Sequence, residues 1–272
     1  MERGEAMDKA QILSEAFSGG RLAIGGHVFL TDPSISEAMA GFGYDFLWID
    51  AEHGPFDKER LLAHIVAANG AGAAALVRVA GNDPIIIKPV LEMGVDGIII
   101  PMVCSAEEAK RAVAACLYPP RGIRGFGPRR ANRYGMVPMD EYLEKADASF
   151  LRIVQIEHVE AVRNLAGILA VEGLDAVIIG PNDLSASIGR LGKLGDPEVV
   201  RLYDEIVSVC KREGMPCGVS IGPGDRQFIR EWIGRGVDFI SCGDDISFMA
   251  IGAAQTMGWI RECRGQGPLA GR

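Results

Sequence analysis

The sequence predicts a (β/α)8 barrel, the TIM-barrel fold, on two observations. Short apolar runs rich in branched residues alternate with amphipathic stretches of alanine, leucine and charged residues. The runs are continuously apolar, which is typical of parallel strands that are buried on both faces. Eight such runs, each followed by a helical stretch, match a barrel of eight β/α units, which takes about 250 residues.

The eight expected strands follow one another along the chain. They are Arg21–Gly25, Tyr44–Asp50, Ala74–Val79, Gly97–Pro101, Phe150–Ile156, Asp175–Ile179, Pro216–Ser220 and Val237–Ser241. Most starts are separated by enough residues for one strand and one helix. The interval before the fifth strand is longer and holds the proline-, arginine- and glycine-rich stretch Tyr118–Pro138.

Helix signals lie between the strands. Ser105-Ala-Glu-Glu108 matches a capping box, which predicts that a helix begins there and ends before Tyr118-Pro-Pro120. Glycines precede several strands, where they are expected to end the preceding helices: Gly43, Gly72, Gly94, Gly173, Gly214 and Gly236.

The chain is interpreted as one domain over residues 1–272, with the barrel core at about 20–250. A doubly wound open sheet is the alternative. However, no G-x-G-x-x-G follows the first strand, and no G-x-x-x-x-G-K-[ST] occurs in the sequence. No nucleotide cofactor is therefore expected.

Composition excludes several classes of protein. Hydrophobic residues make up 48% and charged residues 24%, as in ordinary globular proteins. The net charge of −8 disfavours binding to nucleic acid or to an anionic membrane. The longest apolar runs, such as Gly97–Val103, are far shorter than the roughly 18 residues of a membrane helix. The six cysteines lack zinc-knuckle spacing and are expected to be free thiols of a cytoplasmic protein.

Polar residues stand where the expected strands end, the position of catalytic groups in this fold. Glu157 and Asp183 follow the fifth and sixth strands, so both project toward one mouth of the barrel. Two carboxylates with no cysteine nearby suit a hard divalent cation such as Mg²⁺ or Mn²⁺. The alternative is a pair of salt-bridge or capping carboxylates, since Asp183 is placed to cap the next helix.

Two further strand ends carry groups that fit catalysis. His53 is a candidate general base because imidazole titrates near neutral pH, although a structural role is the alternative. Arg78 in an apolar run requires an anionic partner, either a substrate carboxylate or enolate, or an internal Asp or Glu. His27 and His64 are interpreted as structural. None of the seven lysines ends an expected strand, so Schiff-base chemistry is not expected.

Four ordered motifs resemble one family. Asp45–Pro55 (DFLWIDAEHGP) resembles the signature strand of the metal-dependent, class II pyruvate aldolases. This group contains the 4-hydroxy-2-oxoheptanedioate and 2-dehydro-3-deoxyglucarate aldolases and the citrate lyase β-subunit. Tyr118–Gly127 (YPPRGIRGFG), Gly180–Ser185 (GPNDLS) and Gln155–Glu157 (QIE) are similar to further motifs. The resemblance is collinear and covers roughly residues 20–250.

The resemblance implies a role for each matching residue. Glu157 and Asp183 match the ligands of a divalent cation, Mg²⁺, Mn²⁺ or Co²⁺. His53 matches the catalytic base and Arg78 the transition-state stabiliser. The positions implied to hold the 2-oxo acid are Gln155, Gly180, Pro181, Asn182 and Asp183.

Two positions depart from the family pattern. The family's Leu-Asp-x-Gly motif is Leu91-Glu-Met-Gly94 here, so Glu92 is implied to raise the basicity of His53, with one methylene more than aspartate. Asp50 is a second candidate partner for that histidine. His158 replaces a residue that is often small and hydroxylated, and it is placed either to pack or to lie near the metal.

The implied activity is divalent-metal-dependent cleavage of a 4-hydroxy-2-oxo acid to pyruvate and an aldehyde through a metal-bound enolate. Such reactions belong to the catabolism of aromatic compounds or sugar acids. Oxaloacetate decarboxylation at the same enolate site is an alternative, since both reactions share that intermediate. A thioester lyase fits the Glu-His-Gly-Pro motif less well, and a non-catalytic barrel would not need the four site residues.

The resemblance also implies a homo-oligomer, commonly a hexamer in which neighbouring subunits exchange the C-terminal helix. Phe248–Ile260 is apolar and either packs on another subunit or belongs to the core of its own barrel. The arginines of the long interval are expected to hold that loop or to contact another subunit, with contact to a substrate carboxylate as the alternative: Arg121, Arg124, Arg129 and Arg130. The other partners expected are small molecules, a 2-oxo acid and an aldehyde.

Overall fold

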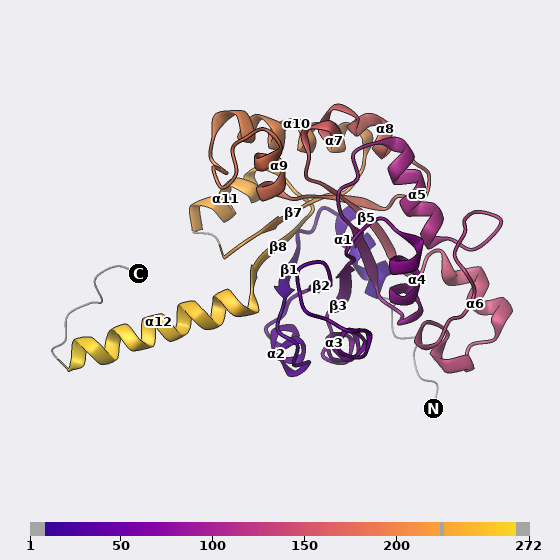
Figure 1. Ribbon diagram of the computed structural model, residues 1–272, viewed down its shortest axis with the longest axis horizontal. Coiled ribbons are helices and arrows are strands. Elements are labelled where there is room, and N and C mark those ends of the chain that lie inside the picture. The colour runs from indigo at the N-terminus through magenta and orange to yellow at the C-terminus, as the bar shows by residue number, and fades with distance from the viewer. Residues whose placement is uncertain (1–8, 224–225, 265–272) are drawn as a thin grey trace.

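The computed structural model describes residues 9–223 and 226–264. Eight parallel strands close into a barrel in which each strand pairs with the next and β8 pairs with β1 (Figure 1). The strands are β1 Ala23–Val28, β2 Phe46–Asp50, β3 Ala74–Arg78, β4 Gly97–Ile100, β5 Leu151–Ile156, β6 Ala176–Ile179, β7 Cys217–Ile221 and β8 Phe239–Asp244. The prediction of a (β/α)8 barrel is confirmed.

All eight expected strands are present, and only their ends differ. The first strand begins two residues later than expected and continues to Val28. Glycine weakens a strand in general, but Gly25 faces the barrel interior, where the Phe46 ring occupies the space that a Cβ atom would need. Packing therefore lets the strand continue past Gly25, where the glycine on its own predicts that the strand ends.

Helices surround the barrel and connect the strands (Figure 1). They are α1 Lys9–Ser18, α2 Ser34–Gly41, α3 Lys58–Gly70, α4 Pro84–Glu92, α5 Ala106–Cys116, α6 Met139–Ala146, α7 Val159–Arg163, α8 Leu165–Leu169, α9 Pro181–Ser187, α10 Pro197–Glu213, α11 Arg226–Arg235 and α12 Asp245–Cys263, with the 3-10 helix η1 Arg130–Gly135 before α6.

The helix signals in the sequence are confirmed. The Ser105 hydroxyl accepts a hydrogen bond from the Glu108 amide at the start of α5, and the Glu108 carboxylate accepts one from the Cys104 amide. All six glycines expected at helix ends have a positive φ, between 69° and 106°. Only glycine adopts that conformation without strain.

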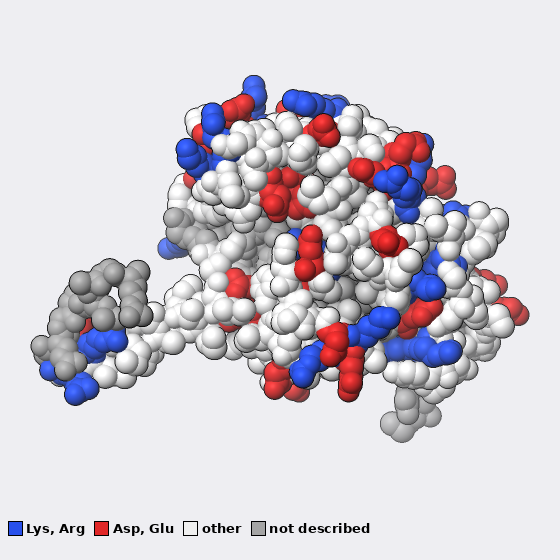
Figure 2. Space-filling view, in the orientation of Figure 1, with Lys and Arg blue, Asp and Glu red and all other residues white. Residues whose placement is uncertain are grey.

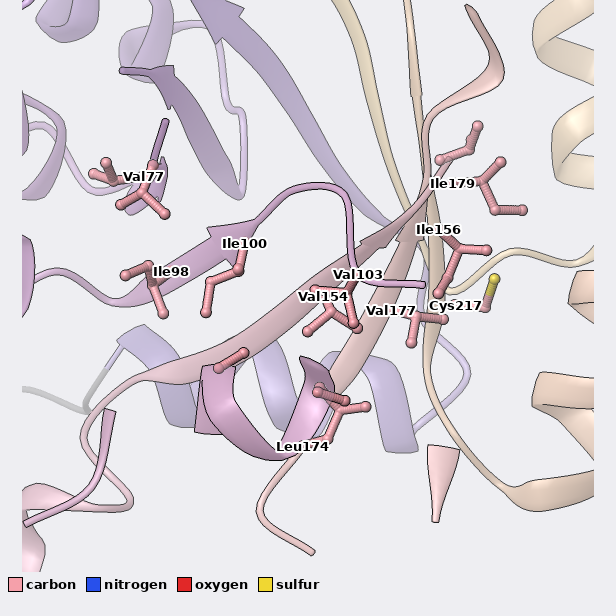
Figure 3. Close-up of a cluster of buried hydrophobic side chains, with 14 of the residues drawn as sticks. Val77, Ile98, Ile100, Val103, Val154, Ile156, Leu174, Val177, Ile179 and Cys217 are labelled. Atoms are coloured by element: carbon pink, nitrogen blue, oxygen red, sulfur yellow. The ribbon is translucent and has the colours of Figure 1, made fainter. Parts of the chain in front are cut away.

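Two apolar layers lie on opposite sides of the barrel wall. Outward-facing residues such as Val77, Val154 and Val177 pack against the helices (Figure 3). Inward-facing residues fill the barrel toward the amino ends of the strands, where α1 covers them and Phe17 stacks on Phe239 with ring centroids 4.6 Å apart. Described side chains fill the barrel interior at that end, so the interior is open toward the carboxyl ends of the strands.

The long interval before β5 contains η1 and α6 and folds against the amino end of the barrel. Arg121 forms an ion pair with Asp147 at 2.7 Å. Arg130 donates to the carbonyl oxygens of Met93 and Gly94 at 3.0 and 2.7 Å. These contacts support the expected role of the arginines in holding the loop.

Helix α12 leaves the barrel as a single long arm (Figure 1). Asp245 is its only buried residue, whereas Phe248, Ile251 and Trp259 are exposed. No charged residue stands between Asp245 and Arg261, and the arm is accordingly uncharged along most of its length (Figure 2). Packing of this segment into its own barrel, one of the two expectations, is therefore wrong. Within the described ranges no helix is long and apolar enough to cross a membrane.

Candidate active site

A layer of polar side chains replaces the apolar filling at the carboxyl end of the barrel. Every second residue of a barrel strand faces the axis. On β2, Trp48 is therefore followed inward by Asp50, and on β3, Leu76 is followed by Arg78. On β5 the last inward residue is Gln155. The strands thus end in the charged and amide groups of one site.

Arg78 is buried and paired with carboxylates of its own chain. Its Nε donates to Asp50 Oδ1 at 3.1 Å, and its Nη2 contacts Asp50 Oδ2. Its Nη1 lies 3.1 Å from Glu52 Oε2. The Trp48 ring lies below, with its centroid 5.2 Å from the guanidinium carbon. Of the two partners expected for this arginine, the structure shows the internal acid.

His53 lies at the rim of the site. Its side chain is 63% exposed, and its Nε2 is 3.8 Å from Glu52 Oε2. Asp50 Oδ1 accepts hydrogen bonds from the backbone amides of Glu52 and His53, both at 3.1 Å. Asp50 therefore fixes the loop that carries His53 through its main chain, while Glu52 is the carboxylate nearest the imidazole.

Glu157 is buried and held at both carboxylate oxygens. Oε1 accepts from the Met102 amide at 2.7 Å, and Oε2 accepts from Gln155 Nε2 at 2.6 Å. Gln155 is oriented in turn by Arg78 Nη1, which donates to its Oε1 at 3.4 Å. Burial raises the pKa of Glu157 to about 7, and the negative charge of Asp183 adds to the effect of burial.

Asp183 stands in the first turn of α9 and is exposed to solvent. Within residues 9–223 and 226–264 its carboxylate accepts no hydrogen bond, so the capping alternative has no support there. Its charge helps to raise the pKa values of Glu157 and Glu52, although burial is the larger cause for each. Asp183 therefore lies close enough to both glutamates for its negative charge to disfavour their ionised forms.

The mouth has the donor set of a hard cation. Arg78 forms ion pairs with Asp50 and Glu52, and its positive charge also acts on Glu157, whose pKa the charge of Asp183 raises. Among the described residues no three acidic, histidine or cysteine side chains form a metal-binding group. Glu157 and Asp183 would thus supply two oxygen ligands and leave the other positions to water or substrate, as Mg²⁺ prefers.

One expected site residue, Glu92, lies outside the mouth of a single subunit. Glu92 ends α4 and is therefore at the amino end of the barrel, the end opposite His53. A Cβ atom at Gly127 would lie 3.0 Å from its Oε1. Within one subunit Glu92 therefore does not contact His53, because α4 runs antiparallel to β3. His158 Nδ1 accepts from the Glu160 amide at 3.2 Å and caps α7.

Comparison with known proteins identifies the family. Residues 24–248 match the HpcH/HpaI aldolase/citrate lyase family. The chain belongs to that family. A 5-keto-4-deoxy-D-glucarate aldolase of Citrobacter koseri is 38% identical over 85% of this chain and 89% of its own length. The prediction of a carbon–carbon lyase of the aldolase type is confirmed.

Solved structures of the HpcH/HpaI family share the whole barrel. The aldolase from Desulfitobacterium hafniense superposes with a TM-score of 0.87 at 30% identity, over 94% of this chain and 99% of its own. A family protein from Burkholderia cenocepacia has a TM-score of 0.87 at 29% identity, over 93% and 99% of the two chains.

Gly180 leaves no room for a side chain in this HpcH/HpaI family barrel. A Cβ atom there would lie 2.6 Å from Gln155 Nε2 and 2.8 Å from Glu157 Oε2. The residue after it, Pro181, is buried at the start of α9, and Asn182 is exposed. Gly180 therefore permits the close approach of β6 to the Gln155–Glu157 pair.

Gly180→Ala is expected to lower kcat/KM about 10²-fold, because displacement of a catalytic group by about 1 Å has an effect of that size. The control is Gly195→Ala, at a position where nothing lies within 4 Å of an added Cβ atom. Steady-state kinetics on both variants measure the difference. Equal activity of the two variants would contradict the assigned contact.

Sequence reasoning missed two contributors to the site. Glu52 stands in the motif already singled out, and its position two residues after Asp50 is a usable signal. Met102 adopts φ 55°, a left-handed conformation that no sequence pattern indicates, and its amide thereby reaches Glu157. His27, interpreted as structural, is buried within the barrel 4.9 Å from the Trp48 ring.

Burial, together with a smaller contribution from the nearby charge of Arg78, lowers the pKa of His27 to about 4. Its Nε2 contacts Ser220 Oγ at 2.9 Å, and its Nδ1 contacts the Gly243 carbonyl at 3.1 Å. Between pH 6.5 and about 4 the unfolded chain binds a proton that the folded chain does not. Stability is therefore lost as the pH falls through that window.

His27→Gln is expected to remove on the order of 2 kcal/mol of the difference in unfolding free energy between pH 7 and pH 5. Urea unfolding at the two pH values measures this difference in the wild type and in the variant. The remaining titrating groups are common to both proteins and cancel in the comparison. An unchanged pH dependence in the variant would show that His27 has the same pKa in the folded and unfolded chains.

Proposed function

We propose that the chain is a divalent-metal-dependent, class II pyruvate aldolase. It cleaves the C3–C4 bond of a 4-hydroxy-2-oxo acid to release pyruvate and an aldehyde. The observation that carries this proposal is the buried Glu157 carboxylate beside the exposed Asp183, with Arg78 and His53 at the same mouth. This arrangement joins an acidic cation site, a fixed positive charge and a solvent-accessible base.

Glu157 and Asp183 would hold the cation. A divalent metal bound there would act as a Lewis acid on the 2-oxo group of the substrate. The hydrogen bonds from Met102 and Gln155 fix the Glu157 carboxylate and leave lone pairs on both oxygens. Binding of a cation also removes the mutual repulsion of the two carboxylates, which contributes to the raised pKa of Glu157.

The protein's own groups account for the proton and charge transfers. His53 removes the proton of the C4 hydroxyl group, and the C4–O bond becomes the carbonyl of the departing aldehyde. The electrons of the C3–C4 bond pass to C3 and give the enolate of pyruvate. The guanidinium of Arg78 stabilises the negative charge that develops on the enolate oxygen. Gln155 and the backbone of Gly180–Asp183 position the 2-oxo acid.

We propose a sugar-acid derivative as the substrate, on the strength of the curated relatives' name. Numbered from its other carboxylate, 5-keto-4-deoxy-D-glucarate is a 4-hydroxy-2-oxo diacid with an unsubstituted C3. Cleavage of its C3–C4 bond gives pyruvate and a three-carbon aldehyde that carries the second carboxylate. The exposed imidazole of His53 lies on the solvent side of the site, where that second half of the substrate would lie.

Pyruvate release, measured with coupled lactate dehydrogenase, tests the proposal. The substrates are 5-keto-4-deoxy-D-glucarate, 4-hydroxy-2-oxopentanoate and oxaloacetate, each with EDTA-treated enzyme before and after Mg²⁺ or Mn²⁺ is restored. We expect metal-dependent release from the hydroxy-oxo acids, with the diacid preferred. Release from oxaloacetate alone would identify a decarboxylase. Activity with none of them would overturn the proposal.

We also propose a homo-oligomer in which α12 packs on a neighbouring subunit, with the hexamer of the resemblance as the expected size. The exposed apolar residues of this uncharged arm support the assignment. Light scattering after size-exclusion chromatography is expected to give a hexamer for the full chain. A chain that ends at residue 244 is expected to be smaller than a hexamer, and a full-length monomer would contradict the proposal.

All six cysteines are free thiols. A protein with free thiols and no disulfide suits a reducing compartment. We therefore propose a cytoplasmic location, as the sequence predicted.

A further inference from the structure

A second cavity, of about 480 Å³, lies at the end of the barrel opposite the candidate active site. Its lining comes from the start of α1, the end of α4, the turns before β4 and β5, and the long interval with η1 and α6. All of these segments precede strands or follow the ends of helices, so they belong to the amino end of the barrel. The cavity is therefore separate from the catalytic mouth.

The lining of this cavity is strongly cationic. Among the residues that the structure describes, four basic side chains line it, those of Lys9, Arg124, Arg130 and Arg133, against one carboxylate, that of Asp96. Asp96 accepts hydrogen bonds from Asn69 Nδ2 at 2.5 Å and from the Ala75 amide at 2.7 Å. The excess of positive charge in this cavity contrasts with the net charge of −8 of the whole chain.

Arg124 is the most informative member because it is buried without a counter-charge. It is only 3% exposed. The other two buried arginines each have a carboxylate partner, Asp50 for Arg78 and Asp175 for Arg152. Arg124 forms no ion pair with any carboxylate in the described part of the chain. A buried charge is normally paired, so this guanidinium lacks an anion.

The neighbours of Arg124 fix the orientation of its planar guanidinium group but carry no negative charge to balance it. The Tyr118 ring stacks on the guanidinium, with its centroid 4.4 Å from the central carbon. Its Nη2 donates a long hydrogen bond to the Tyr142 hydroxyl at 3.4 Å, and its Nε has no partner among the described residues. Stacked, planar arginines of this kind bind carboxylate or phosphate groups through two parallel hydrogen bonds.

The other two arginines add charge without an acidic partner in the described ranges. Arg130 donates through its Nη1 to backbone carbonyl oxygens and through its Nη2 to Asn69 Oδ1 at 2.7 Å, which fixes it but does not neutralise it. Arg133 is exposed at the cavity and forms no ion pair there. One guanidinium is thus buried, one is fixed and one is accessible from solvent.

We propose that this cavity binds a small multivalent anion, of the phosphate or polycarboxylate type, with Arg124 as its buried contact and Arg130 and Arg133 around it. The inference is independent of the proposed catalytic function, since none of these residues lies at the mouth. An anion there would supply the missing counter-charge and stabilise the folded chain by binding it selectively.

Thermal unfolding of the full, EDTA-treated chain tests the proposal. One series uses inorganic phosphate and a second uses citrate, each at constant ionic strength balanced with sodium chloride. We expect a saturable rise in Tm with at least one of the two anions. Saturation by phosphate alone or by citrate alone would support the site and identify the class of anion.

Matched variants locate the binding. Arg133→Gln, at an exposed position that is expected to fold, should weaken the apparent Kd about tenfold or more, the effect of one lost charge-assisted hydrogen bond. Arg124→Lys is expected to weaken it further. Arg121→Gln, in the same loop but paired with Asp147, should bind as the wild type does. No saturable shift, or a shift lost in Arg78→Lys but retained in Arg133→Gln, would overturn the proposal.

Discussion

Glu157→Gln is expected to lower kcat for pyruvate release by about 10² to 10³, the effect of losing one group that stabilises charge in a transition state. The substitution removes a negatively charged ligand. It also places the amide nitrogen of the new side chain beside the hydrogen-bond donors from which the Glu157 carboxylate now accepts. It should leave Tm unchanged or slightly raised, because burial already disfavours the charged form of Glu157. Kinetics and thermal unfolding on one preparation measure both effects.

The matched control for this substitution is Glu160→Gln, which neutralises an exposed carboxylate in the first turn of α7. It should leave kcat within about twofold, because surface changes away from a site have small effects. If Glu157→Gln retained full activity, Glu157 would not be a ligand of the required cation. If it unfolded the protein, its role would be structural.

Asp50→Ala is expected to destabilise the fold by about 3 to 5 kcal/mol, because it leaves the buried Arg78 guanidinium without its principal counter-charge. Asp50 is fully buried and accepts hydrogen bonds from Arg78 and from the backbone amides of Glu52 and His53. The loss therefore affects the β2 loop as well as the ion pair. Urea unfolding at neutral pH measures the free energy of unfolding.

The comparison variant for Asp50 is Glu141→Ala, which breaks the exposed ion pair between Glu141 and Lys145 on α6. Exposed pairs contribute about 0 to 1 kcal/mol, so a small change is expected there. A similarly small change for Asp50→Ala would mean that water reaches Arg78 and hydrates its charge. In that case the guanidinium would not act as a desolvated electrostatic stabiliser.

The fold was predictable because its signals are local and repeated. Continuous apolar runs marked all eight strands, and glycines such as Gly94 and Gly214 marked helix ends, where the structure shows positive φ. The first strand continues three residues past its expected end at Gly25, because the Phe46 ring of a neighbouring strand packs where a side chain at Gly25 would lie. Such a contact depends on packing between strands and leaves no pattern within the strand itself.

The site was predictable to the extent that strand ends determine it. Glu157, Asp183, Arg78 and His53 stand at or just after strand ends, which meet at the carboxyl end of the barrel, while their roles there stay predictions. The sequence alone does not identify the partner of Arg78, because an internal Asp or Glu and a substrate anion would each compensate its buried charge. Only the register of β2 beside β3, with Asp50 opposite Arg78, decides between them.

Glu92 is an expected site residue that one subunit does not bring to His53. The family motif associates it with the histidine, whereas within one subunit α4 carries it to the amino end of the barrel, so its effect on His53 stays a prediction. The direction of a helix between parallel strands is fixed by the fold, so this separation follows once the barrel is accepted. The contribution of Met102 was beyond sequence reasoning, because it depends on one left-handed backbone conformation.

Exchange of the methyl protons of pyruvate in D₂O tests the central claim most directly, because enolate formation at this mouth requires it. The ¹H NMR signal of the methyl group is followed with EDTA-treated enzyme, with Mg²⁺ restored, and with the Glu157→Gln variant. We predict enzyme-dependent exchange only with Mg²⁺ and wild-type Glu157. Exchange that is equally fast without the metal or in the folded variant, or no exchange under any condition, would contradict the assignment of this site.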